Sequence, residues 1–164
     1  MKYSNKYQAS TIQGRVFYCP ETGAFFNQNG SQKVLRMDHL GYMRVNITGA
    51  GALLAHRVAW MLVHGSIPKS HIDHIDSDKT NNRINNLRVC THNQNQHNQG
   101  IRKNNKSGFK GVSWMKSNRK WHAQICCNSK VKHLGFYDEK EDAARAYDKA
   151  AIEIHGEFAW TNFG

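Results

Sequence analysis

The stretch from Phe109 to Gly156 constrains the fold most, because an alternating residue pattern gives way to a helical one within it. Its first part alternates apolar and polar residues in three runs, which turn-forming Ser and Asn residues separate. This pattern is typical of short antiparallel strands joined by tight turns. We therefore predict strands near 109–115, 120–127 and 130–136.

The following segment, DEKEDAARAYDKAAIEIHG, predicts a helix. Asp138 is expected to be its N-cap with Glu141 three residues later, and Gly156 stands where a C-terminal glycine belongs. Alanines repeat on one face at helical spacing, which indicates close packing on a sheet. We expect residues 108–164 to form a three-stranded antiparallel sheet packed on one helix.

Charge is distributed unevenly along the 164 residues. The formal net charge is +11, from 23 Lys and Arg against 12 Asp and Glu. Nine basic residues and no acid lie between Gly100 and Tyr137, whereas seven of the twelve acids lie between Asp138 and Glu157. Lysine and arginine gain affinity by displacing phosphate counterions, so a polyanion such as nucleic acid is the expected partner.

The remaining composition restricts the other classes of protein. Cys19, Cys90, Cys126 and Cys127 form no C-x-x-C pair, so neither a zinc knuckle nor a disulfide framework is expected. No apolar run approaches 18 residues and no signal-peptide pattern follows the first methionine. We expect a cytoplasmic protein that does not bind membranes.

The N-terminal half reads as strands followed by one helix. RVFYCPETGAFFNQNG has a turn between two aromatic runs, which predicts a hairpin, and YMRVNI alternates. LLAHRVAWMLVHG has the apolar spacing of a half-buried helix, which Gly65 ends. A short polar helix could follow after 91, and the residues from Gly100 onward are expected to be a basic linker.

A polar cluster lies between these parts, in HIDHIDSDKTNNRINNLR, residues 71–88. Asp73 and His74 are adjacent, and Asn86 and Asn95 follow. A carboxylate and an amide oxygen are part of the ligand shell that Mg²⁺ prefers, and a histidine near neutral pKa can take a proton from water. The same residue types are common in turns, so a polar loop is the alternative at this point.

The segment HRVAWMLVHGSIPKSHIDHIDSDKTNNRINNLRVCTHNQNQHN resembles the HNH homing endonucleases of phage introns and their free-standing relatives, from about Tyr42 to Asn98. The resemblance implies an α+β fold with a ββα-metal (His-Me finger) core. It matches His74 to the general base and Asn86 to the middle asparagine that orients the loop. It matches Asp73 and Asn95 to the metal ligands.

The implied reaction is hydrolysis of DNA phosphodiester bonds with a single Mg²⁺, for which Mn²⁺ could substitute, and with no organic cofactor. His71, Asp76 and Asp78 match no catalytic position, and we expect them in turns or in solvent. His56 is expected to orient the fold or to contact a phosphate.

The stretch from about Ser107 to Phe163 resembles the DNA-binding domain of plant ethylene-response factors and APETALA-type proteins, through FKGV, WHAQI, LGFY and EDAARAYDKAA. In that family one face of the sheet enters the major groove of double-stranded DNA. By position, the resemblance implies DNA contacts from Lys110, Ser113, Lys116, Arg119, Lys120, Gln124 and Lys132. Several arginine and tryptophan positions of the plant domain differ here, so the plant target sequence is not carried over.

These features predict a site-directed, homing-type DNA endonuclease that acts in a bacterial or phage-infected cell. Its expected parts are a strand-rich extension (1–50), an HNH nuclease core (51–99), a basic linker (100–107) and a DNA-binding domain (108–164). The alternative is a non-catalytic DNA-binding transcriptional regulator, and an RNA-binding or structural protein is a third reading. The sequence leaves open the target site, whether one or both strands are cut, and whether the protein is a monomer or a homodimer.

Overall fold

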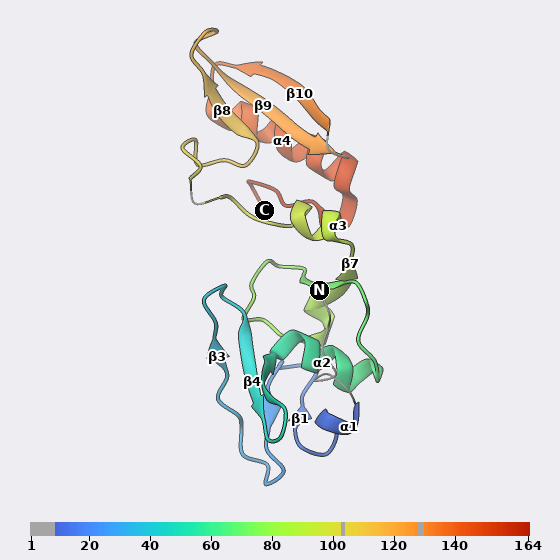
Figure 1. The fold of residues 1–164 in the computed structure, drawn as a ribbon. Coiled ribbons are helices and arrows are strands. Elements are labelled where there is room, and N and C mark those ends of the chain that lie inside the picture. Colours follow the sequence, from blue (N-terminus) through green and yellow to red (C-terminus); the bar gives the residue numbers. More distant parts are fainter. Residues whose placement is uncertain (1–8, 103, 128–129) are drawn as a thin grey trace. The chain divides into compact units, whose positions relative to one another are not determined.

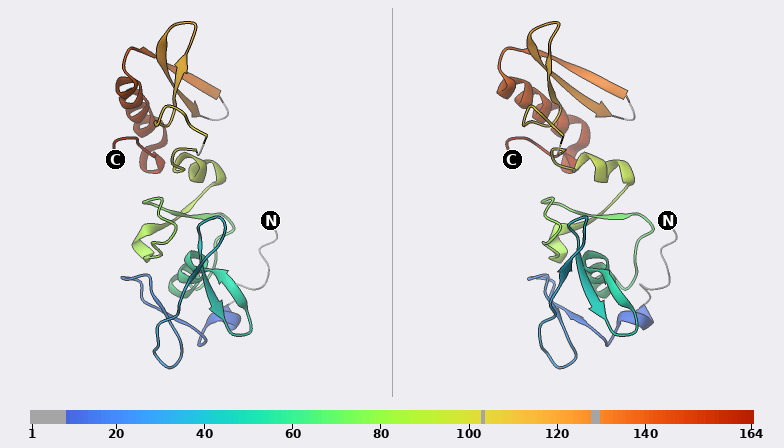
Figure 2. Two further views of the ribbon diagram at one scale, coloured as in Figure 1. Left: turned by 90° about the vertical axis from the view of Figure 1, so that its left-hand side faces the viewer. Right: turned by 60° about the vertical axis from the view of Figure 1, so that its left-hand side comes forward.

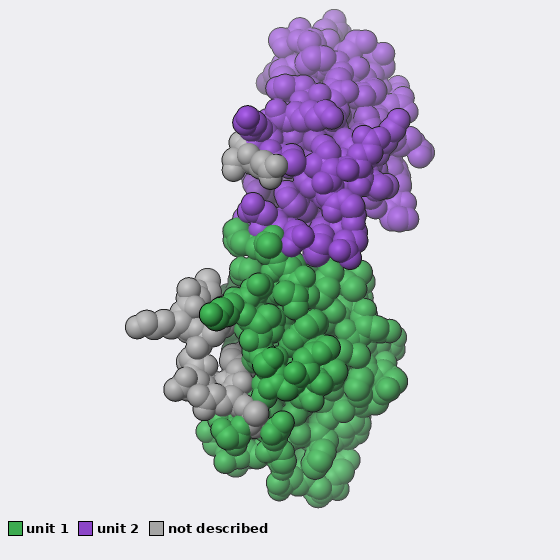
Figure 3. Space-filling view, turned by 90° about the vertical axis from the view of Figure 1, so that its right-hand side faces the viewer, with its two compact units in different colours: residues 1–92 green, residues 93–164 purple. Residues whose placement is uncertain are grey.

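The computed structural model describes residues 9–102, 104–127 and 130–164, and the chain divides into two compact units, residues 1–92 and 93–164 (Figures 1 and 3). In chain order the first unit contains α1 (Ala9–Ile12), β1 (Phe17–Tyr18), β2 (Phe25–Phe26), β3 (Arg36–Met37), β4 (Met43–Ile47), β5 (Gly51–Leu54), α2 (Ala55–His64), β6 (His71–His74), η2 (Ile84–Asn86) and β7 (Leu87–Cys90). The second contains most of α3 (His92–His97), then β8 (Val112–Met115), β9 (Lys120–Cys127), β10 (Lys130–Tyr137), α4 (Lys140–His155) and η3 (Gly156–Phe158). None of the helices in the described part of the chain has the length and apolar composition of a membrane span.

The core of the first unit lies where α2 packs near the antiparallel sheet β3-β4-β5 (Figure 1). Val45, Leu53, Val58 and Met61 are buried there, at alternate positions of the strands and one side of the helix. The predicted helix is confirmed, and it ends as expected at Gly65, which adopts φ 74° and donates its amide to the Met61 carbonyl. The first half of the helix is buried on all sides, including His56 and Arg57, and its exposed residues lie in its last turn.

The predicted ββα order is present in β6, β7 and α3. The strands β6 and β7 pair antiparallel, with Asp73 opposite Arg88 and His74 opposite Leu87. The long polar segment between them, residues 75–83, contains turns and bends and leads into the short helix η2. The fold of this part is therefore the α+β, ββα arrangement that the sequence indicates.

The second unit is a three-stranded antiparallel sheet, in the order β10-β9-β8, with α4 along one face (Figures 1 and 2). The three predicted strands and the helix are confirmed, although the first strand begins only at Val112. Four alanines of α4 are buried against the sheet, as their spacing predicts: Ala143, Ala144, Ala150 and Ala151. Small side chains allow the helix to approach the strands closely, so the core of this unit is thin.

The start of α4 differs from the sequence prediction. Glu139, not Asp138, is the N-cap residue, and it makes no side-chain capping hydrogen bond. The carboxylate of Asp138 pairs instead with the Lys120 ammonium, at 3.2 Å across the end of the sheet. A salt bridge to a strand thus replaces the cap that the local sequence pattern favours.

The segment expected to be a linker contains no helix or strand among its described residues, yet its end is attached to the second unit. The Ser107 hydroxyl is buried and donates a hydrogen bond of 2.8 Å to the Val112 carbonyl. The Asn105 amide donates to the Phe109 carbonyl at 2.8 Å. The expected boundaries of the linker stay a prediction, and these two side chains hold its end to the sheet.

Candidate functional site

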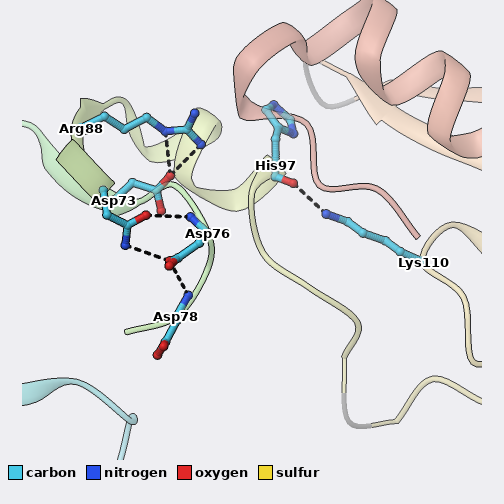
Figure 4. A network of polar contacts seen from close by, with 7 residues as sticks. Asp73, Asp76, Asp78, Arg88, His97 and Lys110 are labelled. Carbon is cyan, nitrogen blue, oxygen red and sulfur yellow. Dashed lines mark hydrogen bonds and ion pairs between the residues drawn. The ribbon is translucent and has the colours of Figure 1, made fainter. Parts of the chain in front are cut away.

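Asp73 and His74 lie next to each other on β6, and both are buried. Adjacent side chains of a strand point to opposite faces, so the two groups have different surroundings. The Asp73 carboxylate accepts two hydrogen bonds at Oδ2 from Arg88 on the paired strand, from Nε at 3.2 Å and from Nη2 at 3.0 Å (Figure 4). The strand register sets this ion pair, because Asp73 and Arg88 are directly opposite.

His74 faces a buried aromatic group. Its ring lies 5.1 Å from the ring of His56 and 6.2 Å from that of Tyr42, measured between centroids. Its Nε2 lies 3.4 Å from Oδ1 of Asn82. Burial lowers the pKa of His74 below its usual value, while the contact with Asn82 and nearby carboxylates act in the opposite direction. His74 is therefore held as a neutral imidazole at neutral pH.

Asn82 also determines which nitrogen of His74 carries the proton. The amide nitrogen of Asn82 donates to the Thr80 carbonyl at 2.9 Å, which identifies the atom facing His74 as the oxygen. An amide oxygen can only accept a hydrogen bond, so Nε2 of His74 must donate it. The basic nitrogen of the neutral ring is then Nδ1.

Asn86 holds the loop after β6. Its amide nitrogen donates to Oδ1 of Asp76 at 2.8 Å and to the Asn81 carbonyl at 2.9 Å, and its Oδ1 accepts from the Asp76 amide at 3.1 Å. Asp76 in turn accepts the amide of Asp78 at 2.9 Å (Figure 4). Burial alone would raise the pKa of Asp76, but the hydrogen bonds from Asn86, Asn81 and the Asp78 amide lower it overall. Asp76 and Asp78 thus build the turn, as expected, and Asn86 fixes that turn to β7.

The N-terminal hairpin of β1 and β2 also supports the loop that contains Asn82, through hydrogen bonds and close packing. The Tyr18 hydroxyl donates to the Asn82 carbonyl at 2.7 Å, and the amide of Ile84 donates to the Pro20 carbonyl at 3.1 Å. Gly23, at φ 75°, packs so closely that a Cβ there would lie 2.8 Å from the Arg83 nitrogen. Sequence reasoning missed Asn82 and Tyr18, because the residues joined by the Tyr18 bond are 64 positions apart and no local pattern relates them.

For the DNA endonuclease that the sequence predicts, we expect the Tyr18→Phe variant to cleave DNA severalfold more slowly. We also expect it to lose about 1 kcal/mol of stability, which is the usual net value of one hydrogen bond. Without the hydroxyl, the Asn82 carbonyl loses its donor, and the partner of His74 is less well held. Cleavage rate and urea unfolding are the measurements. Tyr137→Phe is the matched control, since it removes a similar bond of 3.1 Å to the Leu134 carbonyl in the other unit. Equal cleavage by Tyr18→Phe and the unaltered protein would contradict the bracing role.

His56 is the second histidine of this group, at the start of α2. It is 4% exposed, and its Nδ1 has no hydrogen-bond partner among the described residues. Burial, followed by the nearby His74 and Arg57, lowers the pKa of His56 to about 3. A histidine that is buried as a neutral ring must take up a proton when the protein unfolds in acid.

His56 should therefore make the first unit sensitive to acid. Its folded pKa lies below its unfolded value of about 6.5, so the unfolded chain binds the extra proton and stability falls as pH decreases from about 6.5 toward 3. We expect a loss of several kcal/mol across that window, at about 1.4 kcal/mol per pKa unit. The His56→Leu variant should lose much of this slope and keep its stability at pH 7, measured by urea unfolding at a series of pH values. The control His39→Leu, at an exposed position, should keep the slope.

Asn95 lies half-buried in α3, within the second compact unit, whereas Asp73, His74 and Asn86 belong to the first. No three His, Cys, Asp or Glu side chains in the described part of the chain gather in a way that could hold a metal ion. The oxygen donors of Asp73 and Asn95 suit a hard cation such as Mg²⁺, which commonly takes only one or two carboxylates and keeps several waters. The donor chemistry of the predicted ligands therefore fits a divalent metal.

The predicted DNA contacts of the second unit lie in different places. Ser113 and Gln124 are exposed on the face of the sheet opposite α4, and Lys120 lies on that face at its end. Lys116 and Arg119 are exposed in the turn between β8 and β9, where Arg119 has φ 52°.

Two of the predicted lysine contacts lie elsewhere. Lys132 stands opposite Ile125, whose side chain is buried toward α4, and so it is on the helix side of the sheet. Lys110 is half-buried, and its ammonium donates to the backbone carbonyl of His97 at 2.7 Å (Figure 4). It also donates to the carbonyl of Gln99. Burial lowers the pKa of Lys110 to about 8. Its position favours a structural contact, which its place in the sequence does not reveal.

Comparisons with known proteins match two separate stretches of the chain. Residues 53–97 match the HNH endonuclease family, and residues 107–157 match the AP2 domain. The chain is 35% identical over 105 residues to Protein 3.8 of Escherichia phage T7, covering 63% of this chain and 86% of that protein. It is 34% identical over 114 residues to the uncharacterized HNH endonuclease L560 of Acanthamoeba polyphaga mimivirus, covering 68% of this chain and 58% of that protein.

The C-terminal part is similar to plant proteins, and a solved structure is similar to most of the chain. Over 59 residues the chain is 44% identical to the ethylene-responsive transcription factor WRI1 of Arabidopsis thaliana, which is 35% of this chain and 14% of that factor. A solved structure of DNA binding and cleavage by the HNH homing endonuclease I-HmuI is similar with a TM-score of 0.47 and 20% identity, covering 90% of this chain and 89% of that one. The chain thus spans most of the phage protein but only a small part of the plant factor.

Proposed function

This chain belongs to the HNH endonuclease family and carries a C-terminal AP2 domain, and on that premise we propose that it hydrolyses DNA phosphodiester bonds with His74 as the general base and one divalent metal ion. The observation that supports this most is the buried, neutral His74 beside Asp73, with its Nε2 fixed by Asn82. A neutral imidazole with one defined basic nitrogen is what a general base requires.

In the proposed mechanism, different residues accept the proton, position the loop and bind the metal ion. Nδ1 of His74 accepts the proton of the attacking water, while Asn82 keeps the ring in the tautomer that leaves this nitrogen basic. Asn86 keeps the loop after β6 in place through Asp76. Asp73 and Asn95 would hold the metal, Mg²⁺ or Mn²⁺, which when bound stabilises the negative charge on the leaving 3′-oxygen.

The second unit supplies affinity for double-stranded DNA in this proposal. The run from Gly100 to Tyr137 contains nine basic residues and no acid, so its contacts with phosphates are favourable. Ser113, Lys120 and Gln124 on the exposed face of the sheet, with Lys116 and Arg119 in the adjoining turn, are the proposed contacts. The similarity to a phage protein supports action in a phage-infected bacterial cell.

Incubation of the full chain with supercoiled plasmid tests the activity directly. We expect relaxed or linear DNA to form with Mg²⁺ or Mn²⁺ and no cleavage to occur with EDTA. Cleavage that is unchanged by EDTA would contradict the metal requirement. Tight DNA binding without cleavage under any metal condition would favour the alternative, a non-catalytic DNA-binding regulator.

A further inference from the structure

The face of the β8-β9-β10 sheet that points away from α4, here the reading face, has an unusual set of side chains. It is defined by Ser113, His122, Gln124, Val131, His133 and Phe136, which the strand register places on one side: Ser113 and Phe136 stand opposite His122, and His133 stands opposite Gln124. Ala123 and Ile125, the intervening residues of β9, are buried toward α4. The helix α4 lies on the opposite face, and no described helix of this unit covers the reading face (Figure 2).

Aromatic and apolar groups dominate the middle of the reading face. The His122 ring lies 4.9 Å from the Phe136 ring and 5.0 Å from the His133 ring, between centroids. Nε2 of His122 and Nδ1 of His133 are 2.9 Å apart, within hydrogen-bonding distance. His122 is only 4% exposed beneath these neighbours, whereas Phe136 is 46% and Val131 is 53% exposed. The buried histidine thus supports a rigid surface from which two large apolar side chains project.

The polar groups of the reading face have a definite chemical bias. Gln124 is exposed at its centre, and no arginine occurs in the described residues of β8, β9 or β10. The lysine that the register places on this face, Lys120, lies at its end, and its ammonium pairs with the Asp138 carboxylate at 3.2 Å. Bidentate arginine or lysine contacts are the commonest way to read guanine, whereas glutamine pairs with N6 and N7 of adenine. Apolar side chains contact the 5-methyl group of thymine, which is the only apolar group on a base edge in the major groove.

We propose that the reading face selects DNA segments rich in A·T pairs, with Phe136 and Val131 against thymine methyl groups and Gln124 on an adjacent adenine. The positive charge of the surrounding stretch favours a polyanion such as DNA as the occupant of this apolar surface over an uncharged or basic protein. The inference rests on the proposed DNA-binding function of the second unit and adds the chemical class of sequence that it recognises.

Duplexes selected from a random pool by the full chain, at one fixed salt concentration, provide the substrate for the test. We expect A·T pairs at the selected central positions. Replacing each selected thymine by deoxyuridine removes only its methyl group, and we expect roughly a tenfold loss of affinity at the contacted positions, in the range for one good base contact. Replacing the adjacent adenine by 7-deazaadenine should cause a similar loss, because N7 is one of the two atoms that glutamine contacts.

Single-residue variants show which side chain causes each of these losses of DNA affinity. Phe136→Ala should lose the sensitivity to deoxyuridine at the position that Phe136 contacts and Val131→Ala at the position that Val131 contacts, while Gln124→Ala should become insensitive to 7-deazaadenine. The matched control is Ile152→Ala, which removes a side chain that is 58% exposed on α4 and should keep both sensitivities. Circular dichroism of each variant checks that the sheet is folded.

The outcomes separate this inference from the proposed function. Selection of G·C pairs, or equal affinity for thymine and deoxyuridine duplexes by the unaltered chain, would overturn the inference and leave DNA binding intact. Absence of any salt-dependent duplex binding would overturn the DNA-binding role as well as the inference. Plasmid cleavage requires both the nuclease site and DNA affinity, so the conclusions on base preference rest on the binding measurements and not on cleavage.

Discussion

Replacement of His74 by alanine is expected to slow DNA cleavage by about 10²–10⁴-fold, the range usually supplied by a general base. The ring is 3% exposed, its Nε2 is held by Asn82, and Nδ1 is the nitrogen that takes the proton from water in the proposed reaction. Plasmid cleavage under single-turnover conditions, with Mg²⁺ at a saturating concentration, measures the effect on chemistry. DNA affinity should stay within about twofold, because the reading face and its basic surroundings belong to the other unit.

The control for this result is His71→Ala, which removes another histidine of the same strand, three residues earlier and half-buried. It should retain most of the cleavage rate. Urea unfolding of both variants separates lost chemistry from lost structure. A His74→Ala protein that is folded, binds DNA and cleaves as fast as the unaltered chain would exclude His74 as the base and require another group to activate water.

The second large effect is expected from Gly111→Ala, in the second unit. Gly111 has φ 76°, and a Cβ there would lie 2.0 Å from Cδ2 of Tyr147 on α4 and 2.7 Å from the Gln124 carbonyl oxygen. The backbone strain and the overpacking together should cost on the order of 3–5 kcal/mol. A unit with so small a core has only a few kcal/mol of stability, so most molecules should have this unit unfolded.

Gly108→Ala is the matched control. Gly108 has φ 82°, yet a Cβ there would meet no atom within 4 Å. This variant should show only the backbone strain of about 1 kcal/mol and keep its DNA affinity. Unfolding in urea followed by tryptophan fluorescence, together with duplex binding, measures both. Equal stability of the two variants would show that the contact between Gly111 and Tyr147 is looser than the structure indicates.

The sequence predicts those parts of the molecule whose determinants are local. Alternation in 109–136 and helical spacing after it predict the sheet and α4, because each strand and the helix must bury one face. The resemblance to HNH endonucleases implies that Asp73, His74 and Asn86 act together, and these three lie on or beside the β6-β7 pair. The boundary at Asp138 is wrong because a partner on another strand, Lys120, competes for its carboxylate.

What the sequence does not predict depends on contacts between distant segments. Asn82 is one of several asparagines in a polar turn, and only the structure shows that it is the partner of His74. The positions of Lys110 and Lys132 likewise follow from packing and strand register, which a count of basic residues does not contain. The ion pair between Arg88 and Asp73 likewise depends on the register of two strands, which no local pattern of residues contains.

The β1-β2 hairpin supports the loop around Asn82, and this support limits how the site can be transferred to another protein. Residues 53–97, which match the nuclease family, do not include Tyr18, Pro20 or Gly23, which support the loop around Asn82. A graft limited to the matching segment would carry the reacting groups without the support that orders them. The smallest portable nuclease of this chain is therefore the first unit extended through α3, which carries the proposed metal ligand Asn95, and recombination between relatives should conserve the N-terminal hairpin together with the motif.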